Sequence, residues 1–478
     1  MKKLIQILGI VALAIVVILN IVYTADMNSG EQISIKFSSF IYIIGLIITA
    51  ILIYFITEVI NKHLYNGINE EKKRKLRKWI VAIAIVLYLI LNVVWLIFVR
   101  PGIVADSIHV LNLAQTFYEN NPDRYLPNLT YAGIPLIQYM QAYPHQITLA
   151  FVYNMLFCVL HCDLTILPRI FNVFFNLLII LALYKITKQL SKDYKMNNTR
   201  MFILILTFFT IPMLATFMYG DIPALALSLF SVYFMMKFTD TKQVRYGVFA
   251  SILTMIAYLM RMNTLIFVIA MFLVLTFVPS SLVKTYYFSK YNLEKGKTYP
   301  SISYILMAME EGPRANGWYN ETIAEPALRS LKTGENISDE YKEKIKNRLE
   351  YFAKHPAYTV DFYRQKLTTT WAESTYSAIF NNGITEESNL SWIKSPLTFY
   401  QKAWIILTFT LAIIVLIQNR KKLTIELIFL VTIFLGGFCF HILWEAKSRY
   451  IIPYIVTLIP VASVMLNIKP WKIKKLNS

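Results

Sequence analysis

Two acidic residues, Asp106 and Asp221, lie a few residues from the ends of long apolar segments. Asp106 ends the sequence Arg-Pro-Gly-Ile-Val-Ala-Asp, and Asp221 is the central residue of Tyr-Gly-Asp-Ile-Pro. A carboxylate beside apolar surface is costly, so its presence at such a place is informative. Such a group can act as a general base that takes the proton of an attacking hydroxyl group. The competing interpretation for both residues is a helix N-cap.

Cationic residues occur in comparable positions and predict anion binding. Arg261 interrupts an apolar stretch in Arg-Met-Asn, which ends at Asn263. Near the C-terminus, the sequence Trp-Glu-Ala-Lys-Ser-Arg-Tyr contains Glu445, Lys447 and Arg449. The cations Arg261, Lys447 and Arg449 are candidates for holding a phosphate, and the planar guanidinium group of an arginine suits this best. Asn263 and Glu445 are candidates for positioning the substrate, with ordinary interfacial anchoring as the alternative for the C-terminal group.

A polar turn, Tyr-Pro-His-Gln at 143–146, lies between the two acidic positions in the chain. Pro144 restricts the backbone and predicts a turn before an apolar segment. His145 is then a candidate for binding phosphate at the membrane surface, and Tyr143 and Gln146 are candidates for positioning the substrate. A structural or solvated histidine is the alternative.

Other motifs for chemistry are weaker, or the sequence lacks them. Cys158, His161 and Cys162 have helical spacing, but no second cluster completes a zinc site, so we expect buried core residues there. The sequence contains no Walker loop, no Gly-rich dinucleotide motif and no Gly-x-Ser-x-Gly elbow. The absence of these motifs fits a substrate that is not a nucleotide derivative. The sequence predicts no definite cofactor, and it leaves a divalent metal open without supporting one.

The elements that position these residues must be largely embedded in a membrane. Of the 478 residues, 56% are hydrophobic and 16% are charged, which departs from the balance of soluble domains. The formal net charge of +19 does not indicate a nucleic-acid partner, because the basic residues form short blocks between apolar runs. Such blocks are typical of the cytoplasmic loops of membrane proteins. We therefore predict an all-α polytopic protein of the cell membrane, with about 10–12 transmembrane helices.

Ten apolar segments approach the roughly 20 residues that cross a bilayer. They are 4–22, 37–57, 79–99, 168–186, 201–218, 222–238, 246–278, 401–418, 423–441 and 450–467. With Lys2 and Lys3 placed inside, every basic block falls on the cytoplasmic side, including 185–200 and the tail from Lys469. Both termini are therefore predicted to be cytoplasmic, and the first segment is interpreted as an uncleaved anchor.

Two apolar segments do not fit a simple crossing. Residues 147–160 would reverse the charge pattern as a full span, so they are predicted to form an interfacial or re-entrant helix. The stretch 246–278 is interpreted as one crossing plus a re-entrant or tilted piece. The external regions are then 100–167, the turn at Asp221 and 285–400.

The predicted organisation has four parts. A two-span hairpin with a basic cytoplasmic loop (1–78) precedes a transmembrane core (79–284). Region 285–400 is about charge-balanced and contains a Glu- and Lys-rich helical stretch near 339–354, so we expect a small extracytoplasmic α or α+β domain. Residues 401–478 supply the C-terminal spans and a basic tail.

The order of these motifs resembles the GT-C superfamily of polytopic glycosyltransferases. The likeness is to the protein-mannosyltransferase and aminoarabinose-transferase branch in its Gram-positive bacterial form. It extends over residues 79–467 and treats the first two spans as an addition. The motifs are, in chain order, the external Asp106, Tyr143-Pro-His-Gln, Tyr219-Gly-Asp-Ile-Pro, Arg261-Met-Asn, Gly317-Trp-Tyr-Asn, Thr370-Trp-Ala-Glu and Trp444-Glu-Ala-Lys-Ser-Arg-Tyr.

The resemblance implies an inverting sugar transfer at the outer membrane face. The donor would be a polyprenyl-phosphate-linked sugar, and the acceptor a glycan, a lipid or a protein of the cell envelope. Asp106 matches the catalytic base of the family, and Asp221 matches a second acidic residue that positions the acceptor, the base or a metal. Ser107 follows Asp106 where a metal-dependent variant has a second acidic residue, which weakens the case for a metal.

Two other classes of function are compatible with a polytopic chain. A flippase or transporter for lipid-linked glycans predicts related halves and charges near the middle of the membrane, and the sequence shows neither. A non-catalytic assembly protein would use 285–400 as its binding module and would not require Asp106.

Overall fold

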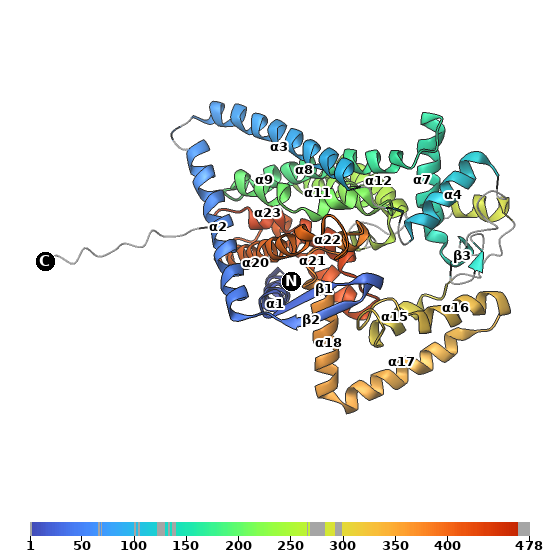
Figure 1. Ribbon diagram of the computed structural model, residues 1–478. Coiled ribbons are helices and arrows are strands. Elements are labelled where there is room, and N and C mark those ends of the chain that lie inside the picture. The colour runs from blue at the N-terminus through green and yellow to red at the C-terminus, as the bar shows by residue number, and fades with distance from the viewer. Residues whose placement is uncertain are drawn as a thin grey trace.

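The structure is a computed structural model, and it is helical through most of the chain (Figure 1). It describes residues 2–65, 67, 69–99, 102–103, 106–121, 130–131, 134–135, 140–264, 266–267, 283–291 and 299–466. Strands in these ranges form only two short antiparallel hairpins, β1–β2 and β3–β4.

Eight helical segments in the described ranges are long and apolar enough to cross a membrane. They are α1 (Lys2–Val22), α2 (Phe40–Tyr65), α3 (Glu70–Phe98), α8 (Ile166–Leu190), the run Asn198–Thr216, α11 (Asp221–Thr241), α20 (Lys394–Gln418) and α21 (Ile425–Leu443). Much of the apolar surface of α2 and α3 is exposed, which suits contact with lipid. The prediction of a mostly helical, multi-pass membrane protein is confirmed at this level.

The helices pack in layers (Figure 1). Helices α3, α8 and α11 lie in one layer with α12 (Val244–Met260), and α20 and α21 lie in the next. Helix α1 packs against α20 and α21, where the side-chain amide of Gln6 donates to the carbonyl of Leu416 at 2.8 Å. Helix α2 also packs against α20, so both of the first two spans belong to the bundle.

The last predicted span, 450–467, is wrong as a single helix. The chain forms a short turn of 3-10 helix (Ser448–Ile451), then α22 (Ile452–Val456) and α23 (Ile459–Ala462). Pro453 and Pro460 lie within this segment, and each lacks the N–H that a continuing helix requires. Hydropathy alone does not register such breaks.

Two helices flank the bundle at one end. Helix α7 (Pro144–Leu160) is a 17-residue apolar helix and coincides with the helix predicted at 147–160. Helix α4 (Ser107–Glu119) packs against it. Cys158 lies on the exposed side of α7, and Cys162 is half-buried just beyond its end. The expectation that they are buried core residues is therefore wrong.

Region 285–400 is helical where it is described. It contains α15 (Ile302–Met309), α16 (Glu321–Thr333), α17 (Ile337–Lys354), α18 (Pro356–Trp371) and α19 (Ala378–Asn381). Helix α17 confirms the helix expected near 339–354. Lys366 of α18 is buried and donates to the carbonyl oxygens of Ile442 and Trp444, at 2.9 and 3.1 Å. It thereby caps the C-terminal end of α21 and fixes this region to the bundle.

The opposite end of the bundle gathers segments that the charge pattern of the sequence predicts to be cytoplasmic. Buried Arg200 forms an ion pair with Glu58 near the end of α2 and donates to the carbonyl of Ala462 at 2.7 Å. The ammonium group of Lys2 donates to the carbonyl of Leu423 at 3.3 Å. These segments share one end of the molecule, as the alternation of spans requires.

Candidate functional site

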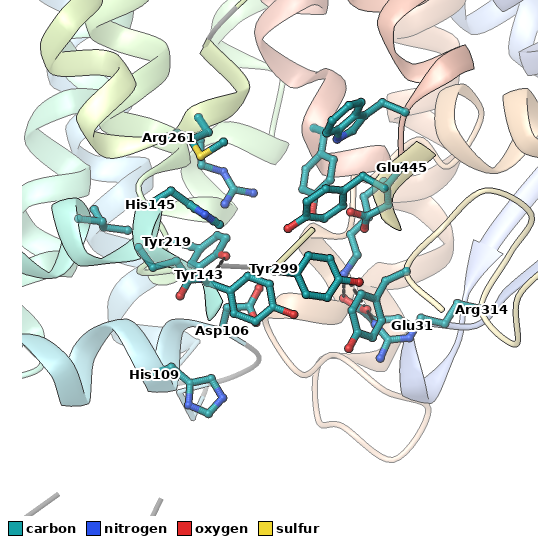
Figure 2. A pocket seen from close by; sticks show the side chains of 18 of the residues that line it. Glu31, Asp106, His109, Tyr143, His145, Tyr219, Arg261, Tyr299, Arg314 and Glu445 are labelled. Atoms are coloured by element: carbon teal, nitrogen blue, oxygen red, sulfur yellow. Dashed lines mark hydrogen bonds and ion pairs between the residues drawn. The ribbon is translucent and has the colours of Figure 1, made fainter. Parts of the chain in front are cut away.

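A cavity of about 470 Å³ lies where α4, α7, region 299–319 and the turn after α21 meet. Asp106, His145 and Arg261 lie on one side of it, and Glu31, Arg314 and Glu445 on the other (Figure 2). Much of the remaining lining is aromatic, and its tyrosines include Tyr143, Tyr219, Tyr299, Tyr304, Tyr319 and Tyr450. The charged side chains of this lining can bind an anionic part of a ligand, and the flat faces of its rings can contact an uncharged part.

Asp106 occupies the N-cap position of α4 and lines the cavity. Its side chain makes no capping hydrogen bond, so the helix-cap interpretation does not account for the carboxylate. The charge of Asp106 is close enough to Glu445, across the cavity, to raise the pKa of that group. The position suits a base that faces a bound hydroxyl group.

Arg261 caps the end of α12 and lies in the same cavity. Its Nε donates to Asp221 at 3.0 Å, and its guanidinium carbon lies 4.1 Å from the ring centre of Tyr219. The guanidinium plane is therefore held by an ion pair and a ring contact together. Figure 2 shows the group extending between the two walls.

Asp221 does not line this cavity. It lies behind Arg261, in a small adjoining pocket that it shares with Arg449, whose Nε is 3.8 Å from the Asp221 carboxylate. The arginine also lies 4.2 Å from the ring centre of Phe217. Asp221 and Arg449 therefore support the wall of the cavity, and Arg261 and Tyr450 line both this pocket and the main cavity. The geometry suits a positioning role for Asp221 and not the role of a second base.

The polar turn before α7 lines the cavity as predicted. Tyr143, His145 and Gln146 all contribute to its wall, and the side-chain amide of Gln146 donates to the Tyr219 hydroxyl at 2.6 Å. Burial, assisted by the charge of Arg261, lowers the pKa of His145 to about 3. The imidazole is therefore neutral at neutral pH and offers a hydrogen bond to a ligand instead of a positive charge.

Two charged residues of the cavity, Glu31 and Arg314, are among the lining residues that the sequence analysis missed. Glu31 lies at the tip of the hairpin formed by β1 (Tyr23–Met27) and β2 (Ile33–Phe37), and Arg314 follows α15. Glu31 accepts hydrogen bonds from the Lys447 ammonium at 2.9 and 3.1 Å and forms an ion pair with Arg314. The Ser-Gly-Glu tip between two short alternating segments was the available sequence signal.

A buried carboxylate, that of Glu373, fixes the segment from Trp444 to Tyr450 through hydrogen bonds. Glu373, in the predicted Thr-Trp-Ala-Glu motif, accepts a hydrogen bond from the Ser448 hydroxyl at 2.7 Å and from the Ser377 amide at 2.6 Å. The carbonyl of Gly317 accepts from the Ala446 amide at 2.9 Å. These motifs therefore act on the site by fixing the loop that carries Lys447.

Glu445 is a buried carboxyl group on the cavity wall. Burial raises its pKa to about 7, against the opposing effect of Lys447. The folded protein thus holds this proton more tightly than the unfolded chain. The resulting stabilisation is complete below the unfolded pKa of about 4.5 and is lost as the pH rises toward 7.

Replacing Glu445 by Gln should therefore change stability in a pH-dependent way. The amide keeps the shape of the neutral acid, so the variant avoids the cost of an ionised buried carboxylate at pH 8, about 3 kcal/mol for a shift of this size. The compared quantity is the melting temperature of Glu445→Gln minus that of the unsubstituted protein. We expect this difference to be larger at pH 8 than at pH 5. Equal differences at both pH values would contradict the buried, proton-holding state of Glu445.

The turn that brings Tyr219 and Asp221 to Arg261 depends on glycine. Gly220 has a φ of 80°, and a Cβ at this position would lie 2.4 Å from the Met260 carbonyl oxygen. The left-handed backbone alone costs a residue with a side chain about 1–2 kcal/mol. Replacing Gly220 by Ala should lower the melting temperature clearly.

The matched control is Gly247→Ala on α12, where the nearest atom to a new Cβ is at 3.5 Å. Alanine at a helical position without a clash is neutral or stabilising, by up to about 1 kcal/mol. Equal behaviour of the two variants in thermal unfolding would contradict the tight turn at Gly220.

Asn263 and the question of a metal site complete the comparison with the sequence analysis. Asn263 lies in the short turn Met262–Thr264, but its side chain is outside the described residues. Within the part of the chain that is described, no His, Cys, Asp or Glu side chains group as a metal site requires.

Comparisons with protein-family models, curated proteins and solved structures returned no match. The site is therefore interpreted from its own geometry.

Proposed function

We propose that this protein is an integral membrane glycosyltransferase of the GT-C type. It transfers a sugar from a polyprenyl-phosphate donor to an acceptor of the cell envelope, with inversion, on the extracytoplasmic side of the cell membrane. The observation that carries the proposal is the cavity that unites the Asp106 carboxylate with the cations Arg261 and Lys447 at one end of an apolar bundle.

The chemistry divides between the two walls of the cavity. Asp106 takes the proton of the acceptor hydroxyl as its oxygen attacks the anomeric carbon of the sugar. The bond to the lipid phosphate breaks at the same centre, and negative charge develops on the departing phosphate. Arg261, held in place by Asp221, stabilises that charge.

The remaining lining suits the sugar and the lipid. Aromatic rings such as Tyr143 and Tyr299, whose ring centres lie 5.3 Å apart, offer flat faces to a saccharide. The neutral imidazole of His145 can form a hydrogen bond with the sugar. Because it carries no charge, it does not draw the phosphate away from Arg261. The polyprenyl chain lies along the apolar spans, whose exposed side chains are compatible with lipid.

The test compares the envelope glycans of cells with and without the protein. We expect one sugar to be missing from the cells that lack it and to return when the chain is supplied again. The purified protein should then release polyprenyl phosphate when it is given the donor of that sugar and an envelope extract. Unchanged glycans together with no release of polyprenyl phosphate would refute the proposal.

A further inference from the structure

The tip of the β1–β2 hairpin carries an unusual backbone conformation. Glu31 has a φ of 60° and Gly30 a φ of 75°, both in the left-handed region. This region is unfavourable for a residue with a side chain, and such residues concentrate at ligand sites and switches. Glu31 is also nearly buried, with 9% of its surface exposed. Its contacts must therefore compensate for both the strain and the lost hydration.

Those contacts are two cations from distant parts of the chain. The Lys447 ammonium donates to both oxygens of Glu31, and Arg314 forms an ion pair with one of them. Burial opposes ionisation of Glu31, but Lys447 and Arg314 outweigh it and hold the pKa of the carboxyl group below its ordinary value. Glu31 is thus an anion bound by a pair of cations inside the cavity.

The position of Glu31 differs from that of the other acidic partner in this region. Asp221 neutralises Arg261 from behind the cavity wall, which leaves the arginine facing the interior. Glu31 lines the cavity itself, together with Lys447 and Arg314. A ligand anion that binds both Lys447 and Arg314 must therefore replace the Glu31 carboxylate, whereas Glu321 can keep its own ion pair with Arg314 at 2.7 Å.

We propose that Lys447 and Arg314 form a phosphate-binding subsite, and that Glu31 occupies it as an internal anion until a phosphate ester displaces the hairpin tip. A phosphate ester suits this exchange because a phosphodiester brings two charged oxygens to the same two donors, as a carboxylate does, and a phosphate monoester brings a third oxygen and more negative charge. The phosphate belongs either to the lipid donor or to a phosphodiester of the acceptor. The subsite requires no sugar transfer, so it can exist even where the proposed function fails.

The hairpin is attached in a way that permits release. In the described residues, β1 and β2 pair only with each other, and a lone two-stranded hairpin is marginally stable. Besides Glu31, the tip end is held by a hydrogen bond from the Ile33 amide to the Arg314 carbonyl at 3.0 Å and by the contact of Met27 with Trp318 and Ala315. The strands also pack against α18, where the guanidinium carbon of Arg364 lies 5.1 Å from the ring centre of Tyr23. Displacement of the tip alone can therefore leave the contacts of the strands with α18 in place.

The experiment measures phosphate binding to the full-length protein in lipid nanodiscs by calorimetry. The probes are inorganic phosphate, polyprenyl phosphate and a glycerol-phosphate oligomer. If the tip is released about one time in ten, Glu31→Gln should tighten binding about tenfold, because the subsite no longer has an internal competitor. The double variant Lys447→Gln, Arg314→Gln should lose this binding. Stronger tightening for one of the two esters identifies the source of the phosphate, and equal tightening shows a general phosphate site.

The matched control is Asp26→Asn, which removes an acidic group of the same hairpin that does not line the cavity. We expect its phosphate affinity to be unchanged. Weaker or unaltered binding in a folded Glu31→Gln variant would overturn the proposal.

Hydrogen exchange of the unsubstituted protein gives a second test that does not depend on a variant folding. Saturating phosphate should accelerate exchange of the amides in 23–37, and unchanged exchange would contradict displacement of the tip. Phosphate binding at this subsite in a protein without transferase activity would refute the proposed function alone.

Discussion

Replacing Asp106 by Asn should reduce sugar transfer by about 10²–10⁴-fold, the usual contribution of a general base. Asparagine has the same shape as aspartate but cannot accept the proton of the acceptor hydroxyl at neutral pH. It also serves as a helix N-cap, so the start of α4 should be preserved. The measurement is the rate of polyprenyl-phosphate release by the purified variant, with thermal unfolding as the check on folding.

The control for this loss is Asp163→Asn. Asp163 follows α7 and accepts a hydrogen bond from Gln115 at 3.5 Å, outside the lining of the cavity. Its transfer rate should equal that of the unsubstituted protein. Transfer that survives in a folded Asp106→Asn variant but is lost in Glu445→Gln would assign the base to Glu445 instead.

Replacing Arg261 by Gln should lower transfer by about 10²–10³-fold, because the departing phosphate loses a preorganised positive group. The same change leaves Asp221 half-enclosed beside Arg449 without its nearest cation, which also destabilises the fold. Loss of activity and loss of structure must therefore be separated by a second variant.

The double variant Arg261→Gln, Asp221→Asn removes both charges of the ion pair. It should regain much of the melting temperature that Arg261→Gln loses, but its transfer rate should stay low. The matched control is Arg245→Gln, an exposed arginine near the start of the same helix α12, which should keep both properties. Recovery of transfer in the double variant would refute a direct role for Arg261 at the phosphate.

The sequence was informative about the membrane architecture because an apolar run of about 20 residues has few alternatives to a buried helix. The runs that became α1, α8 and α11 show this directly. The prediction was wrong at 450–467, where Pro453 and Pro460 break the helix that mean hydropathy suggested. Proline positions deserve the same weight as apolar content when the end of a bundle is predicted.

The site was predicted in part. Asp106, His145 and Arg261 lie in one cavity, as the shared end of their segments implied. The position of Asp221 behind Arg261 depends on which way two neighbouring side chains point, and the topology does not determine this. Glu31 was missed because the resemblance treated the first two spans, and with them the hairpin between these spans, as an addition, although the hairpin tip supplies part of the cavity wall.

The ion pair between Glu31 and Lys447 joins residues that are 416 positions apart. During synthesis, α1 and the hairpin enter the membrane long before α20, α21 and the turn that carries Lys447 leave the ribosome. Helix α1 and the hairpin are therefore in the membrane before the turn that carries Lys447 has been synthesised. A chain that lacks this turn cannot form the complete cavity. A shortened gene product that ends before Lys447 would be inserted in the membrane but would lack one wall of the site.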